Sequence, residues 1–262
     1  MQLLRLFHSC CLLSLTAMTI GCSSSAKKAS PSDDHAQQIV APVFHVDPLT
    51  AGSISGTIRY TGQKPSRKMI DMSEDPACVE AHHGKALDES LVVSSKGSLA
   101  NAFIYVKDGL QDKRFETPTT PVVIEQNGCW FRPRILGIQT NQVLEVMNSD
   151  PVTHNIHPMA QINREWNHSQ GAGDPPLARR FTKPEVMIPI KCNIHSWMHA
   201  FIGVVSNPYF AVSKEDGTYS IGNLPPGEYT VAVWQERLGT QERQVTVAPH
   251  SNAETNVTFK GQ

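Results

Sequence analysis

From about Ile54 onward, short runs rich in Val, Ile, Phe and Tyr alternate with clusters of turn residues. Each run has the length of a β-strand and is bounded by Gly, Pro, Asn or Asp, which is typical of strands joined by turns. The predicted strands are Ser53–Tyr60, Leu99–Val106, Val122–Glu125, Ile135–Gln139, Val143–Met147, Glu185–Ile190, Phe201–Val205, Thr218–Ile221, Tyr229–Trp234 and Glu242–Val247. Many short strands without helices between them predict an all-β protein built as a sandwich or barrel.

Two segments do not fit the strand pattern. Asp75–Leu87 is the one stretch that could form a short helix, and the polar, Gly- and Pro-rich segment Asn163–Pro176 is expected to be an exposed loop. The 18 Pro and 17 Gly residues disfavour a protein made of long helices. A chain of 262 residues has room for one large domain or two smaller ones with a substantial core.

The charges nearly cancel, with 23 Lys and Arg against 24 Asp and Glu and a formal net charge of −1. Such a chain has no strong field to attract nucleic acid or an anionic membrane surface. We therefore expect no nucleic-acid partner.

The N-terminus has the layout of a bacterial export signal. Arg5 precedes an apolar stretch from Cys10 to Ile20, which is too short for a comfortable membrane span, so residues 1–21 are predicted to be a signal peptide. The sequence Thr19-Ile20-Gly21-Cys22 resembles the lipoprotein box, although Leu is usual at the position of Thr19. The resemblance implies that Cys22 is lipidated and anchors the protein to a membrane. The alternative is an ordinary secretory signal cleaved near Cys22.

Both interpretations place the mature protein outside the cytoplasm, in the periplasm or cell envelope. Residues 22–50 begin with a polar, low-complexity run, and we expect them to form a flexible linker.

Potential metal ligands are concentrated in two segments. The first ends with Asn-Ser-Asp-Pro-Val-Thr-His154-Asn155, and the second contains Cys192, His195 and Met198 with the spacing C-x-x-H-x-x-M. Cys and Met are soft ligands, and His is borderline. Two His and one Cys in a plane, with a weak axial Met, form the ligand set of blue copper sites.

These segments resemble the cupredoxins, the type 1 blue copper proteins of the amicyanin and plastocyanin kind. The resemblance covers residues 98–206 and implies a Greek-key sandwich with one type 1 copper ion. The implied ligands are His154, Cys192, His195 and Met198. The resemblance also implies that Asn155 ties the two ligand loops together, and that the edge of His195 is exposed near an apolar patch supplied by Trp197, as an entry point for electrons.

Other interpretations of the same residues remain open. The scaffold could be free of metal, with Met198 in the core, and His157 and His199 are expected to be exposed without a ligand role. A structural zinc site would need a second Cys-x-x-Cys element, which the sequence lacks. A hydrolytic Cys192–His195 pair would lack an orienting third group.

Three cysteines remain once Cys10 and Cys11 are assigned to the signal peptide and Cys22 to the lipid. An odd number in an oxidising compartment suggests one disulfide and one special thiol. With Cys192 assigned to copper by the resemblance, Cys78 and Cys129 are the predicted disulfide. The alternative is a second metal site formed by Cys78, His82 and His83.

The C-terminal segment has a different character. The sequence Asp216-Gly-Thr-Tyr-Ser-Ile, followed by Leu224-Pro-Pro-Gly-Glu-Tyr-Thr-Val, resembles the carboxypeptidase regulatory-like domain, a small transthyretin-like β-sandwich. We therefore divide the chain into a cupredoxin-like domain at 51–206 and a regulatory-like sandwich at 207–262. Because 207–262 is short for this module and Ser53–Tyr60 resembles its missing first strand, the cupredoxin part is expected to interrupt a split sandwich.

Together these features predict an extracytoplasmic mononuclear type 1 copper protein that carries single electrons to or from a redox protein partner and is not an enzyme. The alternatives are a copper-sequestering lipoprotein and a metal-free β-sandwich lipoprotein for binding or adhesion.

Overall fold

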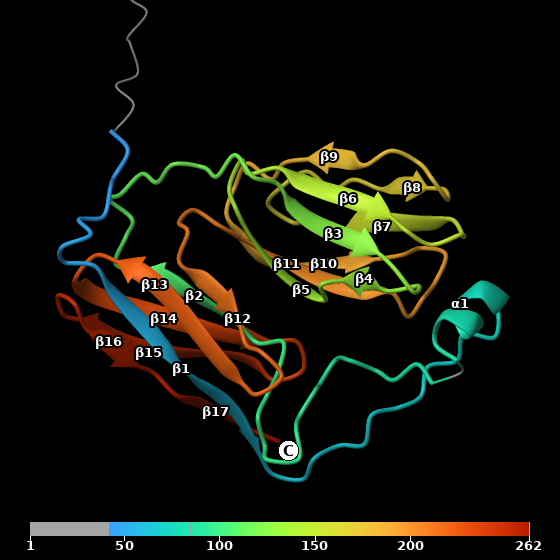
Figure 1. The fold of residues 1–262 in the computed structure, drawn as a ribbon, viewed down its shortest axis with the longest axis horizontal. Coiled ribbons are helices and arrows are strands. Elements are labelled where there is room, and N and C mark those ends of the chain that lie inside the picture. Colours follow the sequence, from blue (N-terminus) through green and yellow to red (C-terminus); the bar gives the residue numbers. More distant parts are fainter. Residues whose placement is uncertain (1–41, 84, 262) are drawn as a thin grey trace, which may run out of the picture. The chain divides into compact units, whose positions relative to one another are not determined.

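A computed structural model describes residues 42–83 and 85–261. These residues form one short helix and seventeen strands, so the predicted all-β sandwich class is confirmed (Figure 1). The predicted signal peptide 1–21, the lipidation site Cys22 and most of the linker 22–50 lie outside the described residues. Within the described ranges, no helix is long and apolar enough to span a membrane.

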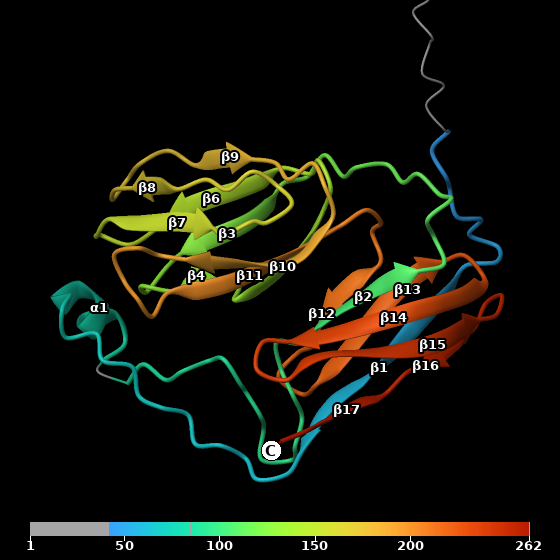
Figure 2. The ribbon, with the colours of Figure 1, turned by 180° about the vertical axis from the view of Figure 1, so that it is seen from behind.

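The strands form two sandwiches, each with its own core. The host sandwich contains β1 (Gly52–Thr61), β2 (Phe103–Asp108), β12 (Phe210–Val212), β13 (Thr218–Leu224), β14 (Gly227–Gln235), β15 (Gly239–Val247), β16 (Asn252–Glu254) and β17 (Val257–Lys260). The inserted sandwich contains β3 (Val122–Gln126), β4 (Phe131–Arg132), β5 (Ile135–Gln139), β6 (Leu144–Asn148), β7 (His154–Pro158), β8 (His168–Gln170), β9 (Leu177–Arg179), β10 (Glu185–Lys191) and β11 (His199–Val205). Figure 2 shows both from behind.

Chain order and sheet order differ in both sandwiches. In the host sandwich, β1 lies between β13 and β16 and also pairs with β17, and the facing sheet has the order β12-β2-β14-β15. In the inserted sandwich the sheets have the orders β5-β11-β10-β7-β8 and β4-β3-β6-β9. The pairs β5–β11 and β3–β6 are parallel, and β10–β11 is an antiparallel hairpin whose connecting loop spans residues 192–198.

The strand pairing corrects the predicted domain boundaries. Strand β1 pairs with β13, and β2 pairs with β14, so segments 52–61 and 103–108 belong to the host sandwich and not to a cupredoxin-like unit 51–206. The C-terminal segment 207–262 alone lacks these strands, which supply Ile54, Ile58 and Ile104 to its core. This arrangement matches the expected split sandwich.

The linker prediction also needs a correction at its C-terminal end. The Phe44 N–H donates to the Arg114 carbonyl at 2.6 Å, and the Phe44 and Phe115 rings contact each other edge to face. Val46 packs against the core of the host sandwich. Residues 42–50 therefore contact the folded protein, because this part of the predicted linker carries apolar side chains that its N-terminal part lacks.

A third apolar cluster joins the two sandwiches. It contains Phe103 from β2, Ile135 from β5, Met187 from β10 and Val205 from β11. Gly203 and Gly137 leave room for the Phe103 ring, since a Cβ on Gly203 would lie 2.5 Å from ring atoms of Phe103. Beside this cluster, the buried Arg134 guanidinium pairs with the Glu236 carboxylate at 2.8 Å.

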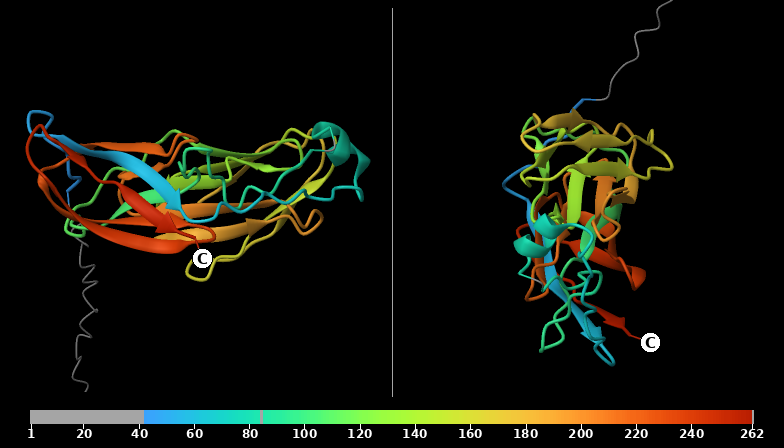
Figure 3. Two further views of the ribbon diagram at one scale, coloured as in Figure 1. Left: turned by 90° about the horizontal axis from the view of Figure 1, so that it is seen from below. Right: turned by 90° about the vertical axis from the view of Figure 1, so that its right-hand side faces the viewer.

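The segment between β1 and β2 contains the helix α1 (Pro76–Ala81), inside the predicted range 75–87. Asp75 caps its N-terminus by accepting the Ala77 N–H at 3.0 Å, and Pro76 occupies the first turn, where its missing N–H costs nothing. The helix ends early, since His83 adopts a positive φ of 48°. Helix α1 lies at the end of the inserted sandwich where the β10–β11 loop turns (Figures 1 and 3).

Candidate metal centre

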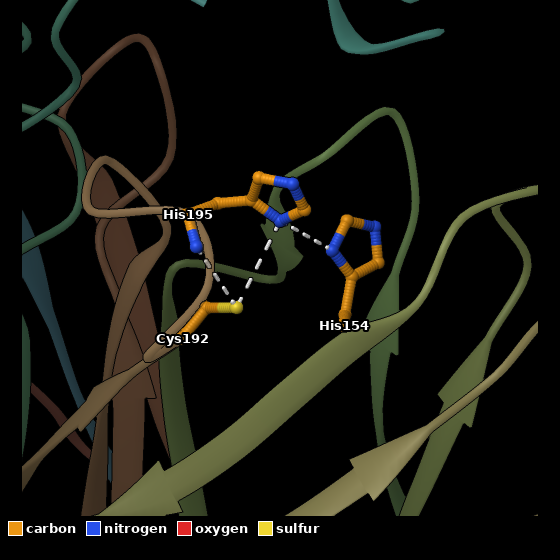
Figure 4. Close-up of side chains that lie close together, drawn as sticks. All are labelled: His154, Cys192 and His195. Carbon is orange, nitrogen blue, oxygen red and sulfur yellow. Dashed lines mark hydrogen bonds between the residues drawn. The ribbon is translucent and has the colours of Figure 1, made fainter. Parts of the chain in front are cut away.

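Three predicted ligands come together at this end of the inserted sandwich. His154 opens β7, Cys192 follows β10 and His195 lies in the β10–β11 loop; all three are buried. Their ligand atoms lie within 4.8 Å of one another, and Figure 4 shows both rings and the thiol turned toward one point. The His154 and His195 Nδ1 atoms are 2.9 Å apart, and the Cys192 Sγ lies 3.9 Å from the His195 Nδ1.

The loop between β10 and β11 is closed by its own backbone. The Cys192 N–H donates to the Met198 carbonyl, and the Met198 N–H donates to the His195 carbonyl, both at 3.1 Å. This compact turn returns the chain into β11 and places Met198 fully buried in the same core cluster as Cys192. The C-x-x-H-x-x-M spacing therefore brings three ligand types onto one short loop beside the strand that carries His154.

Two carboxylates orient the imidazole rings. The His154 Nε2 lies 2.7 Å from the Asp150 Oδ2, and the His195 Nε2 lies 3.1 Å from the Asp75 Oδ2. Because a carboxylate accepts hydrogen bonds, each Nε2 carries a proton, and a ring in its neutral form keeps its lone pair on Nδ1. The carboxylates thus determine which nitrogen of each ring faces Cys192.

This arrangement provides a test of whether the residues fit a metal ion. Two lone pairs that face each other at 2.9 Å repel unless a positive charge lies between them. A shared proton can meet this need in the metal-free protein. A cation that binds two imidazoles and a thiolate also removes this repulsion, and such a donor set suits copper or zinc.

The surroundings of Cys192 favour its thiolate. Burial by itself raises the pKa of Cys192, but hydrogen bonds from His154 and from backbone N–H groups outweigh it, and the net pKa is lowered. The N–H groups of Asn155 and His195 point at the sulfur, each at 3.4 Å. A thiolate is the form that a metal ion binds.

The Asp150–His154 pair is stabilised in its charged form. Burial by itself lowers the pKa of His154, but the hydrogen bonds with Asp150 and Cys192 raise it to about 9. For Asp150, burial raises the pKa, and the bonds from His154 and from the N–H groups of Cys129 and Gly128 outweigh that effect and lower it. Asp150 is therefore a firm acceptor for the His154 ring.

Asn155 connects the two ligand segments, as the sequence predicts. Its side-chain carbonyl accepts the N–H of Asn193, next to Cys192, while its own N–H donates to the Cys192 sulfur. One residue thus links β7 to the β10–β11 loop and contributes to the environment of the thiolate.

Comparisons with known proteins match parts of the chain. Residues 202–260 match the family model of the carboxypeptidase regulatory-like domain. That match begins within β11 and covers the C-terminal strands of the host sandwich. No curated protein matches the chain.

Among solved structures, the chain is similar to three copper proteins over part of its length. A copper-containing nitrite reductase from Thermus scotoductus shares 23% identity over 39% of this chain, with a TM-score of 0.32, and the match spans only 25% of that enzyme. A Cu(I) form of an amicyanin mutant shares 15% identity over 34% of this chain and 86% of its own, with a TM-score of 0.29. A purple cupredoxin from Nitrosopumilus maritimus shares 19% identity over 32% of this chain and 98% of its own, with a TM-score of 0.28.

The structure contradicts the predicted exposure of His195. Its side chain is only 5% exposed, because the Asp75 carboxylate covers its Nε2 edge and Trp197 packs against the ring at 5.1 Å between centroids. The Trp197 indole N–H donates to the Cys129 carbonyl at 3.2 Å, so this ring is anchored as well. The expectation of an open imidazole edge at His195 is wrong for this chain.

Two further histidines lie outside the ligand cluster. His157 is half-buried and hydrogen-bonded to Glu165, and His199 is exposed at the start of β11. The expectation of exposure therefore holds for His199 and is too strong for His157.

The structure joins Cys78 and Cys129 in a disulfide that closes a separation of 51 residues. The bonded Cys78 sulfur leaves no thiol for the alternative metal site with His82 and His83. His82 instead bonds through one ring nitrogen to the Gly128 carbonyl and through the other to the Trp130 indole N–H.

Sequence reasoning missed the two carboxylates. The sequence did offer a signal for Asp150, which lies four residues before His154 in the Asn-Ser-Asp turn. In the structure its two oxygens also accept the N–H groups of Gly128 and Cys129. Asp75 gave no signal, because 120 residues separate it from His195 in the sequence.

Proposed function

We propose that this chain is a mononuclear type 1 copper protein that carries single electrons outside the cytoplasm. The observation that supports it best is the convergence of His154 Nδ1, His195 Nδ1 and Cys192 Sγ, with both Nε2 atoms held by carboxylates. His154, His195 and Cys192 would hold the ion, and Met198 would be the weak axial ligand. Copper in such a set supplies a one-electron couple.

The protein residues would keep this site rigid and dry. The two carboxylates hold the rings, Asn155 and the His195 N–H hold the sulfur, and Trp197 covers one ring face. A cage that changes little between oxidation states lowers the reorganisation needed for electron transfer.

The biological setting belongs to the same proposal. A signal peptide at 1–21 and lipidation at Cys22 would place the protein at a membrane in the periplasm or cell envelope, where a redox protein would be its partner. On this proposal the chain is a carrier and not an enzyme.

Copper sequestration is a second candidate, favoured by one observation. The His195 edge is covered by Asp75, which would slow electron exchange through that edge and retain a bound ion.

The decisive test is addition of Cu(II) to metal-free protein, followed by visible absorption spectroscopy. We expect an intense charge-transfer band from the Cys192 thiolate, absent in Cys192→Ala, and reversible reduction with rapid exchange with a small redox protein. Full copper occupancy without colour would favour sequestration. No copper uptake would favour a metal-free scaffold.

A further inference from the structure

The disulfide and the two carboxylates lie directly beside the ligand cluster. Ligand atoms of Asp75, Cys78 and His195 lie within 4.8 Å of one another, and so do those of Cys129, Asp150 and His154. Each half of the disulfide therefore lies next to one carboxylate–histidine pair. The covalent bond connects the two pairs that orient the ligand rings.

Asp75 belongs to a segment that we call the strap, residues 69–83, which runs between β1 and β2 of the host sandwich. The strap reaches the inserted sandwich through the disulfide, through His82, which bonds to Gly128 and packs against Trp130 at 5.4 Å between ring centroids, and through the buried Met72. These contacts fasten the strap to the 128–130 turn and to the core of the inserted sandwich.

The Asp75 carboxylate makes one contact beyond the N-terminal cap of α1. One carboxylate oxygen, Oδ1, accepts the Ala77 N–H of the helix at 3.0 Å. The other, Oδ2, faces the His195 Nε2 at 3.1 Å. Helix capping needs only the contact of Oδ1. That contact orients the carboxylate so that Oδ2 is available to the His195 ring.

We propose that Asp75 is a positioning residue for His195, and that the Cys78–Cys129 disulfide holds it there, so that the strap is a covalently fastened cover over the His195 edge of the metal centre. The consequence of this inference for electron transfer rests on the proposed copper function. The first experiment below tests the inference in the metal-free protein and does not depend on copper. With the cover in place, the Nε2 edge of His195 is closed to solvent and to a partner.

The first experiment measures access to His195 in the metal-free full-length protein. Diethyl pyrocarbonate modifies accessible imidazoles, and peptide mass spectrometry assigns each modification to a residue. His199 is exposed in the structure and serves as an internal reference. The variants are Asp75→Ala, the double variant Cys78→Ala/Cys129→Ala, and the control Asp71→Asn. Asp71 is an exposed strap residue that accepts the N–H of Ser73.

We expect the His195 modification rate, relative to His199, to rise about ten-fold in Asp75→Ala and in the double variant, since the cover then opens locally. The control should match the wild type. Circular dichroism and thermal unfolding identify a variant that fails to fold; Asp75→Ala keeps the disulfide and remains informative if the double variant does not fold. Unchanged His195 modification in folded Asp75→Ala would overturn the proposal.

A second measurement separates positioning from simple cover. In copper-loaded protein, Asp75→Ala should raise the reduction potential, because it removes a negative charge hydrogen-bonded to a ligand, whereas Asp71→Asn removes an exposed, screened charge and should not. An equal shift in both variants would overturn the positioning role. If the protein binds no copper, the proposed function fails while the modification experiment still decides whether the strap covers His195.

Discussion

At the scale of single residues, Asp150 shows that the orientation of a proposed ligand, His154, depends on a group that is not itself a ligand. Its carboxylate accepts one ring N–H and two backbone N–H groups, so it fixes the His154 ring to the turn that carries Cys129. Metal-binding histidines commonly depend on such a partner for their orientation.

Replacing Asp150 by Asn should therefore weaken both the fold and the site. We expect a loss of about 1.5–3 kcal/mol in the free energy of unfolding of the metal-free protein, because charge-assisted hydrogen bonds are lost. Copper affinity should fall about 10–100-fold. Denaturant titration and chelator competition measure the two effects, with Asp71→Asn as the control. Affinity equal to that of the control would show that Asp150 does not orient His154.

Met198 permits a separate prediction about the axial position. Met198→Leu conserves volume in a fully buried site and should cost less than about 1.5 kcal/mol of stability. The visible band should persist, because the thiolate is unchanged, and the reduction potential should rise, because loss of the thioether donor disfavours Cu(II) more than Cu(I). Voltammetry together with absorption spectroscopy measures both. An unchanged potential would remove Met198 from the ligand set.

At the scale of elements, β10 is anchored at the end opposite to Cys192. Glu185, its first residue, accepts the N–H groups of Gln161 and Asn163, at 2.5 and 2.8 Å. Burial by itself raises the pKa of Glu185, but these hydrogen bonds outweigh it and lower the pKa below its ordinary value of 4.5. The carboxylate therefore joins β10 to the segment that follows β7.

The lowered pKa predicts a pH-dependent contribution to stability. A carboxylate whose pKa is lower in the folded than in the unfolded state stabilises the fold above the unfolded value, and this stabilisation is lost as pH falls through the folded value. Glu185→Gln should cost about 1.5–3 kcal/mol at pH 7. The difference from wild type should shrink as pH falls below 4.5.

Denaturant unfolding over this pH range is the measurement. Glu215→Gln, at an exposed carboxylate, is the matched control and should show little difference from wild type at any pH. A Glu185→Gln deficit that is constant with pH would argue against the charged hydrogen bonds as its source.

At the scale of the whole molecule, the two sandwiches share a packed contact at Phe103. A methyl group on Gly203 would meet the Phe103 ring at 2.5 Å, and this ring is fully buried. Gly203→Ala should therefore destabilise the protein by about 1–3 kcal/mol through overpacking. Thermal or denaturant unfolding measures the loss.

The control for this contact is Gly222→Ala, in β13, where an added Cβ would meet nothing within 4 Å. It tests the intrinsic effect of replacing a strand glycine. Equal stability of the Gly203→Ala and Gly222→Ala variants would show that the contact between the sandwiches is loose.

Much of the local structure and the ligand types could be determined from the sequence alone. Alternating apolar runs and turn residues predict most of the long strands, because both reflect preferences of neighbouring residues. The weak, polar strand β7, His-Asn-Ile-His-Pro, was missed for the same reason: it has no such run, and its pairing with β8 and β10 defines it. The C-x-x-H-x-x-M spacing likewise predicts a soft-metal loop from neighbouring residues.

Only the tertiary structure decided what surrounds that loop. The Asp75–His195 contact joins residues 120 positions apart, and β1 reaches the C-terminal strands across the whole inserted sandwich. Such contacts follow from how packed layers and a disulfide bring distant segments together, and no local pattern encodes them. The family resemblance implies an exposed His195 edge, whereas the folded chain buries this edge beneath the strap.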